Sequence, residues 1–283
     1  MPELPEVEAI RRTLSPEVVG ARIRVVRILR RDVVRDRRGR RRGRLDPVHA
    51  GAGLRIERVD RRGKQLILGF EGGSGLIVRL GMSGRVDLWK GRVRRTPPHR
   101  HLVWVLGSDE RSERRLGFVD PRRFGGIHLY ASPADLDERL LGNLGPEATS
   151  IDPGVLESRL GRTTRAVKVA LLDQSVVAGL GNIYVDEALH RALINPTQPA
   201  DRIDSNGIEM LARSIRSILQ EAIDAGGSTL RDHRLPSGQE GRYRDAHQVY
   251  GRATEPCPRC GTSLTEIRLS ARSTTFCPSC QAL

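Results

Sequence analysis

The sequence predicts an α+β protein with several domains, and three observations support this prediction. Residues 21–130 contain short alternating apolar runs separated by Gly, Pro and Asp, the pattern of antiparallel strands. Apolar residues at helical spacing follow between residues 208 and 222. All four cysteines of the 283-residue chain lie beyond residue 256. We therefore expect a strand-rich part, a helix-rich part and a small cysteine module, in that order.

The first element is expected to be a helix that begins near Pro5. Proline suits the first helical turn because its missing N–H is not needed there, and Val7, Ile10 and Leu14 follow at helical spacing. A Ser-Pro pair and a glycine at residue 20 close this region. The strand-like runs that follow indicate an antiparallel sandwich or barrel. They cover residues 23–25, 54–56, 65–68, 76–78, 102–105 and 127–129.

Weaker patterns divide the rest of the chain. Residues 35–44, almost all arginine and glycine, are expected to form a solvated loop, and residues 131–153 are expected to form a linker. Val167, Ala170, Leu171 and Val176 predict one helix. The stripe over 208–222 predicts another, which Gly226-Gly227 ends. The polar, glycine-containing residues 235–248 are expected to form a mobile loop.

The charge of the chain favours a polyanionic partner. Its formal net charge is +14 and its sequence pI about 10.8, and nucleic acid is the commonest partner of such a surface. A codon bias toward arginine would explain arginine over lysine, but not basic over acidic residues. The apolar runs are far shorter than the roughly 20 residues of a membrane span. The N-terminus, acidic and proline-rich, does not resemble a secretory signal, so a cytoplasmic protein is expected.

The cysteines have the spacing of a metal site. Two Cys-x2-Cys pairs, separated by sixteen residues, match the two knuckles of a zinc ribbon. Four thiolates leave no open coordination position, so the predicted zinc is structural. Two disulfides or four free thiols remain as alternatives. A basic hairpin between the pairs, residues 268–274, is placed to reach a DNA backbone. The four predicted ligands are Cys257, Cys260, Cys277 and Cys280.

The N-terminus carries a candidate nucleophile. Removal of Met1 would leave Pro2 with a free secondary amine; an α-amino group has a pKa of about 8, and a helix start nearby lowers it further. Attack of this amine on a sugar C1′ would give an iminium ion that can drive elimination of the phosphates. Glu3, beside it, can act as a general acid or base. Taken alone, Pro-Glu is ordinary helix-start chemistry.

Seven motifs in the same order make the chain resemble the formamidopyrimidine-DNA glycosylase family, the 8-oxoguanine DNA glycosylases. The resemblance spans nearly the whole chain. The motifs are Met-Pro-Glu-Leu-Pro-Glu-Val-Glu at the N-terminus, Arg61-Arg62-Gly63-Lys64, Leu80-Gly81-Met82-Ser83-Gly84, Asp120-Pro121-Arg122-Arg123-Phe124-Gly125, Leu144-Gly145-Pro146-Glu147, Leu171-Leu172-Asp173-Gln174 with Gly179-Leu180-Gly181-Asn182-Ile183-Tyr184, and Val249-Tyr250-Gly251-Arg252.

This resemblance implies an N-terminal helix with a two-sheet antiparallel β-sandwich, a helix–two-turns–helix domain and a C-terminal zinc finger. The implied domains are a catalytic sandwich (1–135), a DNA-binding helical domain (150–232), a lesion-capping loop region (233–248) and the finger (249–283). It also implies a bacterial, monomeric, nucleoid-associated repair enzyme that binds one zinc ion. Its substrate would be double-stranded DNA with oxidised bases or abasic sites. It would excise 8-oxoguanine and formamidopyrimidines and nick the strand by β,δ-elimination.

The same resemblance assigns roles to individual residues. Pro2 would be the Schiff-base nucleophile and Glu3 the proton donor that helps to open the sugar. Lys64 would contact phosphate and assist β-elimination, and Arg272 would hold a phosphate and assist δ-elimination. A further set would contact DNA phosphates; its members are His99, Lys168, Asn182 and, near the position where the family has a basic residue, Arg165.

Met82, Arg122 and Phe124 match three residues that fill the hole left by an extruded nucleotide. Extrusion costs a few kcal/mol of stacking, which an apolar wedge and a flexible filler partly recover, while the arginine can bond the orphaned base. The chain departs from the family pattern at several positions, of which Arg242 lies in the loop that caps the extruded base in the family and so bears on the lesion preference. These positions are Arg79, Thr164, Arg242 and Ala271.

Three alternatives stay open at this point. The chain could be an endonuclease VIII-like glycosylase for oxidised pyrimidines, although Leu4 and the capping-loop segment favour the purine enzyme. It could be a non-catalytic damaged-DNA-binding homologue, against which the presence of Pro2, Glu3 and Lys64 argues. It could also be an RNA-binding zinc-ribbon protein, which needs none of the N-terminal motifs.

Overall fold

The computed structural model describes residues 2–35, 50–91, 98–107, 113–229 and 234–283. These residues form two units. The first contains residues 1–142 and 226–241, and the second contains residues 143–225 and 242–283. The expected arginine-rich loop at 35–44 falls, apart from Arg35, outside the described residues. None of the described helices is both long and apolar enough to span a membrane.

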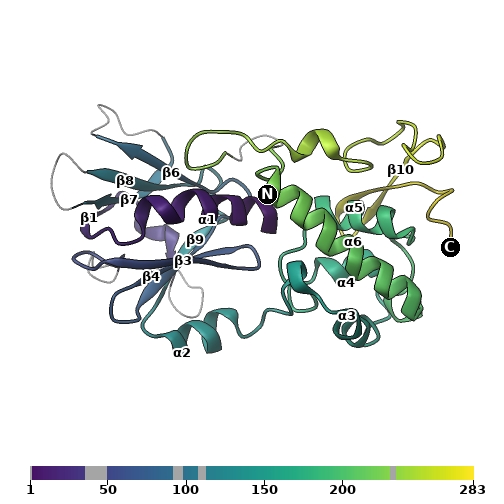
Figure 1. Ribbon diagram of the computed structural model, residues 1–283, viewed down its shortest axis with the longest axis horizontal. Helices are drawn as coiled ribbons and strands as arrows, with labels where there is room; N and C mark the ends of the chain where they lie inside the picture. Colours follow the sequence, from purple (N-terminus) through teal and green to yellow (C-terminus); the bar gives the residue numbers. More distant parts are fainter. Residues whose placement is uncertain (1, 36–49, 92–97, 108–112, 230–233) are drawn as a thin grey trace. The chain divides into compact units, whose positions relative to one another are not determined.

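Helix α1 (Leu4–Val18) opens the first unit. It begins one residue before Pro5, as the sequence predicts, and a capping box between Glu3 and Glu6 closes its first turn. The sequence suggested that this region closes at the Ser-Pro pair and at residue 20. The helix instead includes Pro16 and ends at Val18, two residues beyond it. In Figure 1, α1 is the purple helix labelled beside the sheets.

The strands of the first unit form two sheets, which confirms the predicted sandwich. One sheet has the order β1-β7-β8-β6 and is antiparallel throughout, with β1 (Ile23–Ile28), β7 (Arg100–Leu106), β8 (Arg114–Val119) and β6 (Arg85–Lys90). The other has the order β2-β9-β5-β4-β3, in which only β2 and β9 run parallel. Its strands are β2 (Val34–Arg35), β9 (Gly126–Tyr130), β5 (Gly75–Arg79), β4 (Gln65–Phe70) and β3 (Ile56–Arg62).

Two differences from the predicted strands have physical causes. The run at 54–56 marks only the beginning of β3, which continues through charged residues to Arg62 because one face of the strand is solvated. β6 and β8 were not predicted, since arginine and aspartate interrupt their apolar alternation.

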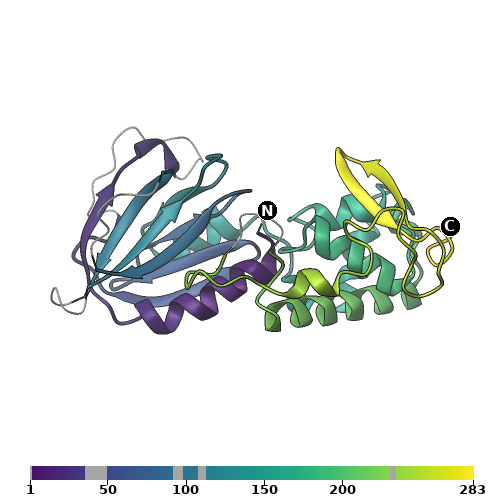
Figure 2. The ribbon, with the colours of Figure 1, turned by 90° about the horizontal axis from the view of Figure 1, so that it is seen from above.

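One apolar core joins α1 to both sheets. Val7, Ile10 and Leu14 of the helix are fully buried in it. Trp104 of β7 lies in the same core, and its indole N–H donates to the Ala50 carbonyl oxygen at 3.0 Å. Figures 1 and 2 show α1 running along the sandwich, beside β3 and β4. The beginning of α1 is therefore fixed by packing along the length of the helix.

Between the sandwich and the helical unit, short helices replace the linker predicted at 131–153. They are α2 (Pro133–Asp135), the π-helical turn Leu136–Leu141 and the 3₁₀ turn Ala148–Ser150. Two further 3₁₀ turns of the chain are Arg31–Val33 and Ala200–Arg202.

The second unit contains four helices and a hairpin. The predicted helix at 208–222 is α6 (Ser205–Asp224), and the helix predicted from Val167 is α4 (Val167–Leu172), which ends before Val176. Helices α3 (Pro153–Leu160) and α5 (Asn182–Ala192) were not predicted. The hairpin of β10 (Thr265–Leu269) and β11 (Arg272–Phe276), yellow in Figure 2, lies beside α5.

The segment predicted as a mobile loop, 235–248, divides between the two units. Its second half contains the 3₁₀ turn Tyr243–Ala246. The ring of Tyr243 is 4% exposed and lies 5.9 Å from the ring of Tyr184, so this half is packed and not a free loop. A buried aromatic side chain outweighs the polar composition around it.

Candidate catalytic and DNA-binding site

The N-terminal residues are held by a buried carboxylate. Pro2 and Glu3 are both buried, directly ahead of α1. The Glu3 backbone N–H donates to Glu6 Oε2 at 2.7 Å, and the Ser228 backbone N–H donates to Glu6 Oε1 at 2.7 Å. A Cβ on Gly227 would lie 2.8 Å from Glu6 Oε1, so this approach requires glycine. Glu6 thus joins the beginning of α1 to the segment 226–241.

Lys64 lies in the turn between β3 and β4, and a second carboxylate holds this turn near α1. Arg61 Nε donates to Glu8 Oε2 at 3.1 Å, and Arg61 Nη1 donates to the Gly63 carbonyl oxygen at 2.9 Å. Gly63 has a φ of 55°, the left-handed region that the turn needs. Both the N-terminal residues and the lysine turn are therefore tied to the same helix.

The pKa of Glu8 reflects this arrangement. Burial raises the pKa of its carboxyl, but hydrogen bonds and charge from Arg11 and Arg61 outweigh burial and bring the pKa to about 2. The two oxygens of Glu8 accept from Arg11 at 2.8 and 2.9 Å. Glu8 is therefore ionised at any pH at which the protein would act.

Met82 and Phe124 are exposed apolar side chains on neighbouring turns. Met82, between β5 and β6, is 43% exposed, and Phe124, between β8 and β9, is 59% exposed. The Arg122 guanidinium carbon lies 4.9 Å from the centre of the Phe124 ring. The structure thus brings these three predicted residues together as exposed tips. His99, also exposed, precedes β7 with a φ of 64°.

Lys168 lies in a different environment from that expected of a phosphate contact. Its side chain is 0% exposed, and its Nζ lies 2.6 Å from Asp186 Oδ1. The same Nζ donates to the Ser273 carbonyl oxygen in β11 at 2.8 Å. Burial raises the pKa of Asp186 to about 7, against the opposing effect of the Lys168 ammonium. The lysine thus connects α4 and α5 to the cysteine module, and we propose below that its role is structural.

Two of the other predicted DNA contacts of the second unit lie near the same hairpin. Asn182 is the first residue of α5, and its Nδ2 donates to the Ser273 carbonyl oxygen at 2.9 Å. Arg272 is exposed at the start of β11, after two residues with positive φ. Arg165 is exposed, with its guanidinium 3.2 Å from Asp173 Oδ2. Lys168, Asn182 and the residue after Arg272 are therefore linked through one carbonyl oxygen.

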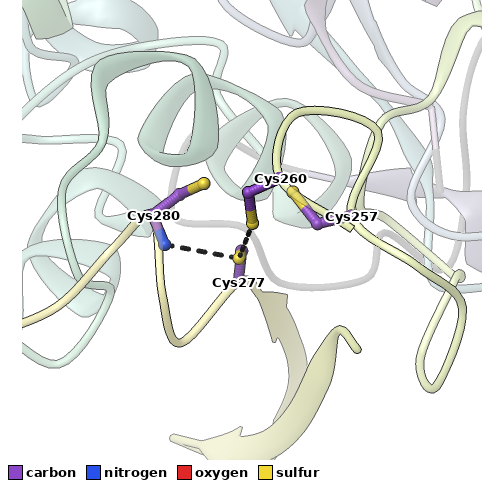
Figure 3. Close-up of side chains that lie close together, drawn as sticks. All are labelled: Cys257, Cys260, Cys277 and Cys280. Carbon is purple, nitrogen blue, oxygen red and sulfur yellow. Dashed lines mark hydrogen bonds between the residues drawn. The ribbon is translucent and has the colours of Figure 1, made fainter. Parts of the chain in front are cut away.

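The four cysteines form the predicted metal site. Their Sγ atoms all lie within 4.8 Å of one another, and Figure 3 shows them arranged around one centre. All four are described, and none is in a disulfide. Cys260 Sγ lies 3.5 Å from Cys277 Sγ, and the Cys280 backbone N–H approaches Cys277 Sγ at 3.3 Å. Four thiolates around one point fit a tetrahedral, structural zinc ion.

Sequence reasoning did not single out the carboxylates that hold these pieces. Glu6 had a signal, since it stands at the capping-box position three residues after Glu3. Glu187 had none: its carboxylate accepts three consecutive backbone N–H groups, from Gln248, Val249 and Tyr250, at 2.8–3.0 Å. These contacts attach the beginning of the cysteine module to α5.

Comparison with known proteins covers the whole chain. Residues 1–127 match the formamidopyrimidine-DNA glycosylase N-terminal domain, residues 144–234 match the helix–two-turns–helix domain of the same enzymes, and residues 255–283 match a zinc finger found in FPG and IleRS. A formamidopyrimidine-DNA glycosylase of Laribacter hongkongensis is 41% identical, over 99% of this chain and 100% of that protein.

Solved structures agree with these matches. The Lactococcus lactis Fpg in complex with DNA containing an abasic site has a TM-score of 0.88 and 34% identity, with 100% of both chains covered. A structure of MutM in complex with DNA containing carbocyclic 8-oxo-G has a TM-score of 0.87 and 35% identity, again with 100% of both chains covered.

Proposed function

Because the chain belongs to the formamidopyrimidine-DNA glycosylase family, and is therefore a glycosylase and AP lyase for oxidised purines in DNA, we propose that Pro2 is its nucleophile. The observation that carries this proposal is the position of Pro2: it directly precedes α1, where Glu6 fixes the next residue by its backbone N–H. Processing of Met1 would place a secondary amine there.

The chemistry follows from that amine. Its lone pair attacks C1′ of the damaged nucleotide, and the bond from C1′ to the base breaks, so that the base leaves with the electron pair. The proton of the attacking nitrogen is then lost, and the departing base takes up a proton, directly or through solvent. Glu3 donates a proton as the sugar ring opens, which leaves an iminium ion between Pro2 and C1′. The iminium acidifies the adjacent C2′ proton; its loss expels the 3′-phosphate, and a second elimination expels the 5′-phosphate. Lys64 and Arg272 are proposed to hold these phosphates.

The exposed tips would replace the extruded nucleotide. We assign Phe124 as the wedge between bases, Met82 as the filler and Arg122 as the partner of the orphaned base. The exposed fractions of Met82 and Phe124 support this assignment, since a side chain that enters the base stack must be accessible before DNA binds. His99, Asn182 and Arg165 are proposed phosphate contacts, so affinity for DNA should fall steeply with salt.

Borohydride trapping tests the nucleophile. The wild type, incubated with duplex DNA containing 8-oxoguanine, should form a reduced covalent adduct, and peptide mapping should place the sugar on the Pro2 nitrogen. A chain with an additional residue ahead of Pro2 should form none, because the nitrogen is then an amide. Pro133→Gly, at the first turn of α2, is the matched control and should be trapped normally. An adduct on Lys64, or full trapping by the extended chain, would refute the assignment.

A further inference from the structure

Three turns of the sandwich unit converge on the buried carboxylate of Asp120. Residues 80–84 connect β5 to β6, residues 98–99 precede β7, and residues 120–125 connect β8 to β9. Asp120 is 0% exposed. The proposed DNA-contacting residues of this unit other than Lys64 all lie on these turns; they are Met82, His99, Arg122 and Phe124.

The side chain of Asp120 binds two of the turns at once. Ser83 Oγ donates to Asp120 Oδ1 at 2.6 Å, and the Gly125 backbone N–H donates to Asp120 Oδ2 at 2.8 Å. The same Ser83 Oγ accepts from the Arg122 backbone N–H at 3.1 Å. A chain of three hydrogen bonds therefore joins Ser83, the residue after Met82, to Arg122 and Gly125, which flank Arg123 and Phe124.

The backbone of Asp120 binds the third turn. Its N–H donates to the His99 carbonyl oxygen at 3.0 Å, and its carbonyl oxygen lies 2.8 Å from His101 Nε2. His101 is itself 3% exposed, in β7. The side chain of Asp120 thus binds the turns of Ser83 and Gly125, and its main chain binds His99 and His101.

Backbone packing leaves these turns little freedom to slide. Gly81 has a φ of 61°, and a Cβ there would lie 2.5 Å from the Gly125 nitrogen and 2.6 Å from the Phe124 carbonyl carbon. A Cβ on Gly125 would overlap the carbonyl oxygen of Arg79. The exposed side chains therefore extend from turns that are closely packed and joined by hydrogen bonds.

We propose that Asp120 and Ser83 are positioning residues that hold the void-filling side chains at a fixed separation before DNA arrives. This inference rests on the proposed function of Met82, Arg122 and Phe124. Side chains that must enter a gap of one nucleotide gain from preorganisation, because each turn that had to order on binding would weaken the complex. We call these contacts the turn lock; they join Asp120, Ser83, Gly125 and Arg122.

Asp120→Asn and Ser83→Ala test the turn lock. Asparagine offers one carbonyl oxygen where aspartate offers two acceptors, so its NH₂ must face either Ser83 Oγ or the Gly125 N–H. The controls repeat both changes at the far end of β9, where the Asp135 carboxylate accepts from the Ala131 N–H at 2.9 Å and Ser132 Oγ accepts from the Asp135 N–H at 3.2 Å. Thermal unfolding of all four variants shows which remain folded, and Ser83→Ala is the milder change.

Two substrates separate positioning from general damage. Duplex DNA with 8-oxoguanine requires the void to be filled, whereas a single-stranded oligonucleotide with a preformed abasic site has no opposite base and no stack to restore. For the turn-lock variants we expect kcat/KM on the duplex to fall about ten-fold or more, with trapping on the single strand within about two-fold of wild type. Asp135→Asn and Ser132→Ala should change neither. Equal losses on both substrates, or an unchanged duplex reaction, would overturn the proposal.

A double-mutant comparison gives a second, independent test. If Asp120 acts through the tips, Asp120→Asn should cost less than about two-fold once Met82 and Phe124 are both alanine. Full additivity would refute the turn lock. The proposed function fails by a different result, the absence of wild-type trapping at Pro2. In that case a fluorescent base opposite an abasic analogue still reports whether the turns insert, and equal signals from wild type and Asp120→Asn would count against the lock.

Discussion

At the scale of single residues, buried carboxylates join separate segments of this protein. Glu6, Glu8, Asp120 and Glu187 each accept two or more hydrogen bonds, at least one of them from a distant part of the chain. A carboxylate with two oxygens can accept from several backbone N–H groups at once, which a guanidinium, a pure donor, cannot do. These acidic residues therefore belong to the framework of the protein, together with a few arginines whose side chains are largely buried, such as Arg61 and Arg100.

Glu8 offers a pH-dependent test. Its pKa is about 2 in the folded protein and about 4.3 in an unfolded chain. The folded state therefore binds fewer protons between these values, so the stability that Glu8 contributes is present above about pH 4.5 and is lost as the pH falls toward 2. We expect Glu8→Gln to lower the free energy of unfolding by about 1–3 kcal/mol at pH 7, and the difference from wild type to shrink below pH 4.

Urea denaturation at several pH values measures this difference. Glu17→Gln is the control in the same helix, because Glu17 pairs with Arg114 at 3.1 Å but is 46% exposed, and such a pair contributes little. A gap between wild type and Glu8→Gln that stayed constant from pH 7 to pH 3 would show that the carboxylate charge is not what holds Arg61.

At the scale of elements, the cysteine hairpin is fastened to the helices by the buried pair of Lys168 and Asp186. Asp186 also accepts the Thr275 backbone N–H at 3.1 Å, so α5 contacts β11 by side chain and main chain together. These contacts also position Arg272, at the start of β11. We propose that Lys168 acts on DNA only through this hairpin.

Removing one member of the pair should be costly. Lys168→Met leaves the Asp186 charge buried without its cation, and we expect the unit to lose about 3–5 kcal/mol of stability. The double variant Lys168→Met/Asp186→Leu should recover part of that loss, since it removes both charges. Hydrogen exchange at β10 and β11 should rise in the single variant and fall back in the double variant. Unchanged exchange in Lys168→Met would show that the pair does not fasten the hairpin.

The elements also show how far sequence reasoning reaches. Local sequence patterns were sufficient to predict α1, α6 and the cysteine knuckles, because a helical stripe or a Cys-x2-Cys spacing involves only residues near one another in the chain. The burial of Lys168 could not be predicted because its partners, Asp186 and Ser273, lie in other elements, the second of them 105 residues away. Burial of a charge depends on such distant partners, and a single sequence does not specify them.

At the scale of the whole molecule, the chain builds two units from interleaved segments and stabilises the last of them with metal. The zinc finger is small, and its polypeptide contacts with the helical unit include Asn195 Nδ2 to the Gln281 carbonyl oxygen at 2.7 Å and Gln281 Nε2 to the Ile194 carbonyl oxygen at 2.8 Å. Gln281 Oε1 also accepts the Cys277 N–H at 2.9 Å. Gln281 is therefore one connection between the metal site and the helices, beside those made by Glu187 and by the pair of Lys168 and Asp186.

Zinc removal should act on one unit. A structural zinc site contributes on the order of 10 kcal/mol to the folding of its module, so a strong chelator should unfold residues 249–283. Hydrogen exchange should rise there and at the end of α5, while β4 and β5 of the sandwich stay protected. Metal analysis of the untreated protein should find one zinc per chain. Loss of protection throughout the sandwich would contradict the separation of the units.

The bond between Glu6 and Ser228 spans 222 positions of the chain. A ribosome completes the helix that contains Glu6, and every strand of the sandwich, long before it reaches that serine. The nascent protein thus contains Pro2, the proposed nucleophile, from the beginning, but the hydrogen bond from Ser228 to Glu6 can form only after residue 228 has been made. A chain that ended before Ser228 would keep Pro2 and Glu6 but would lack this hydrogen bond near the beginning of α1.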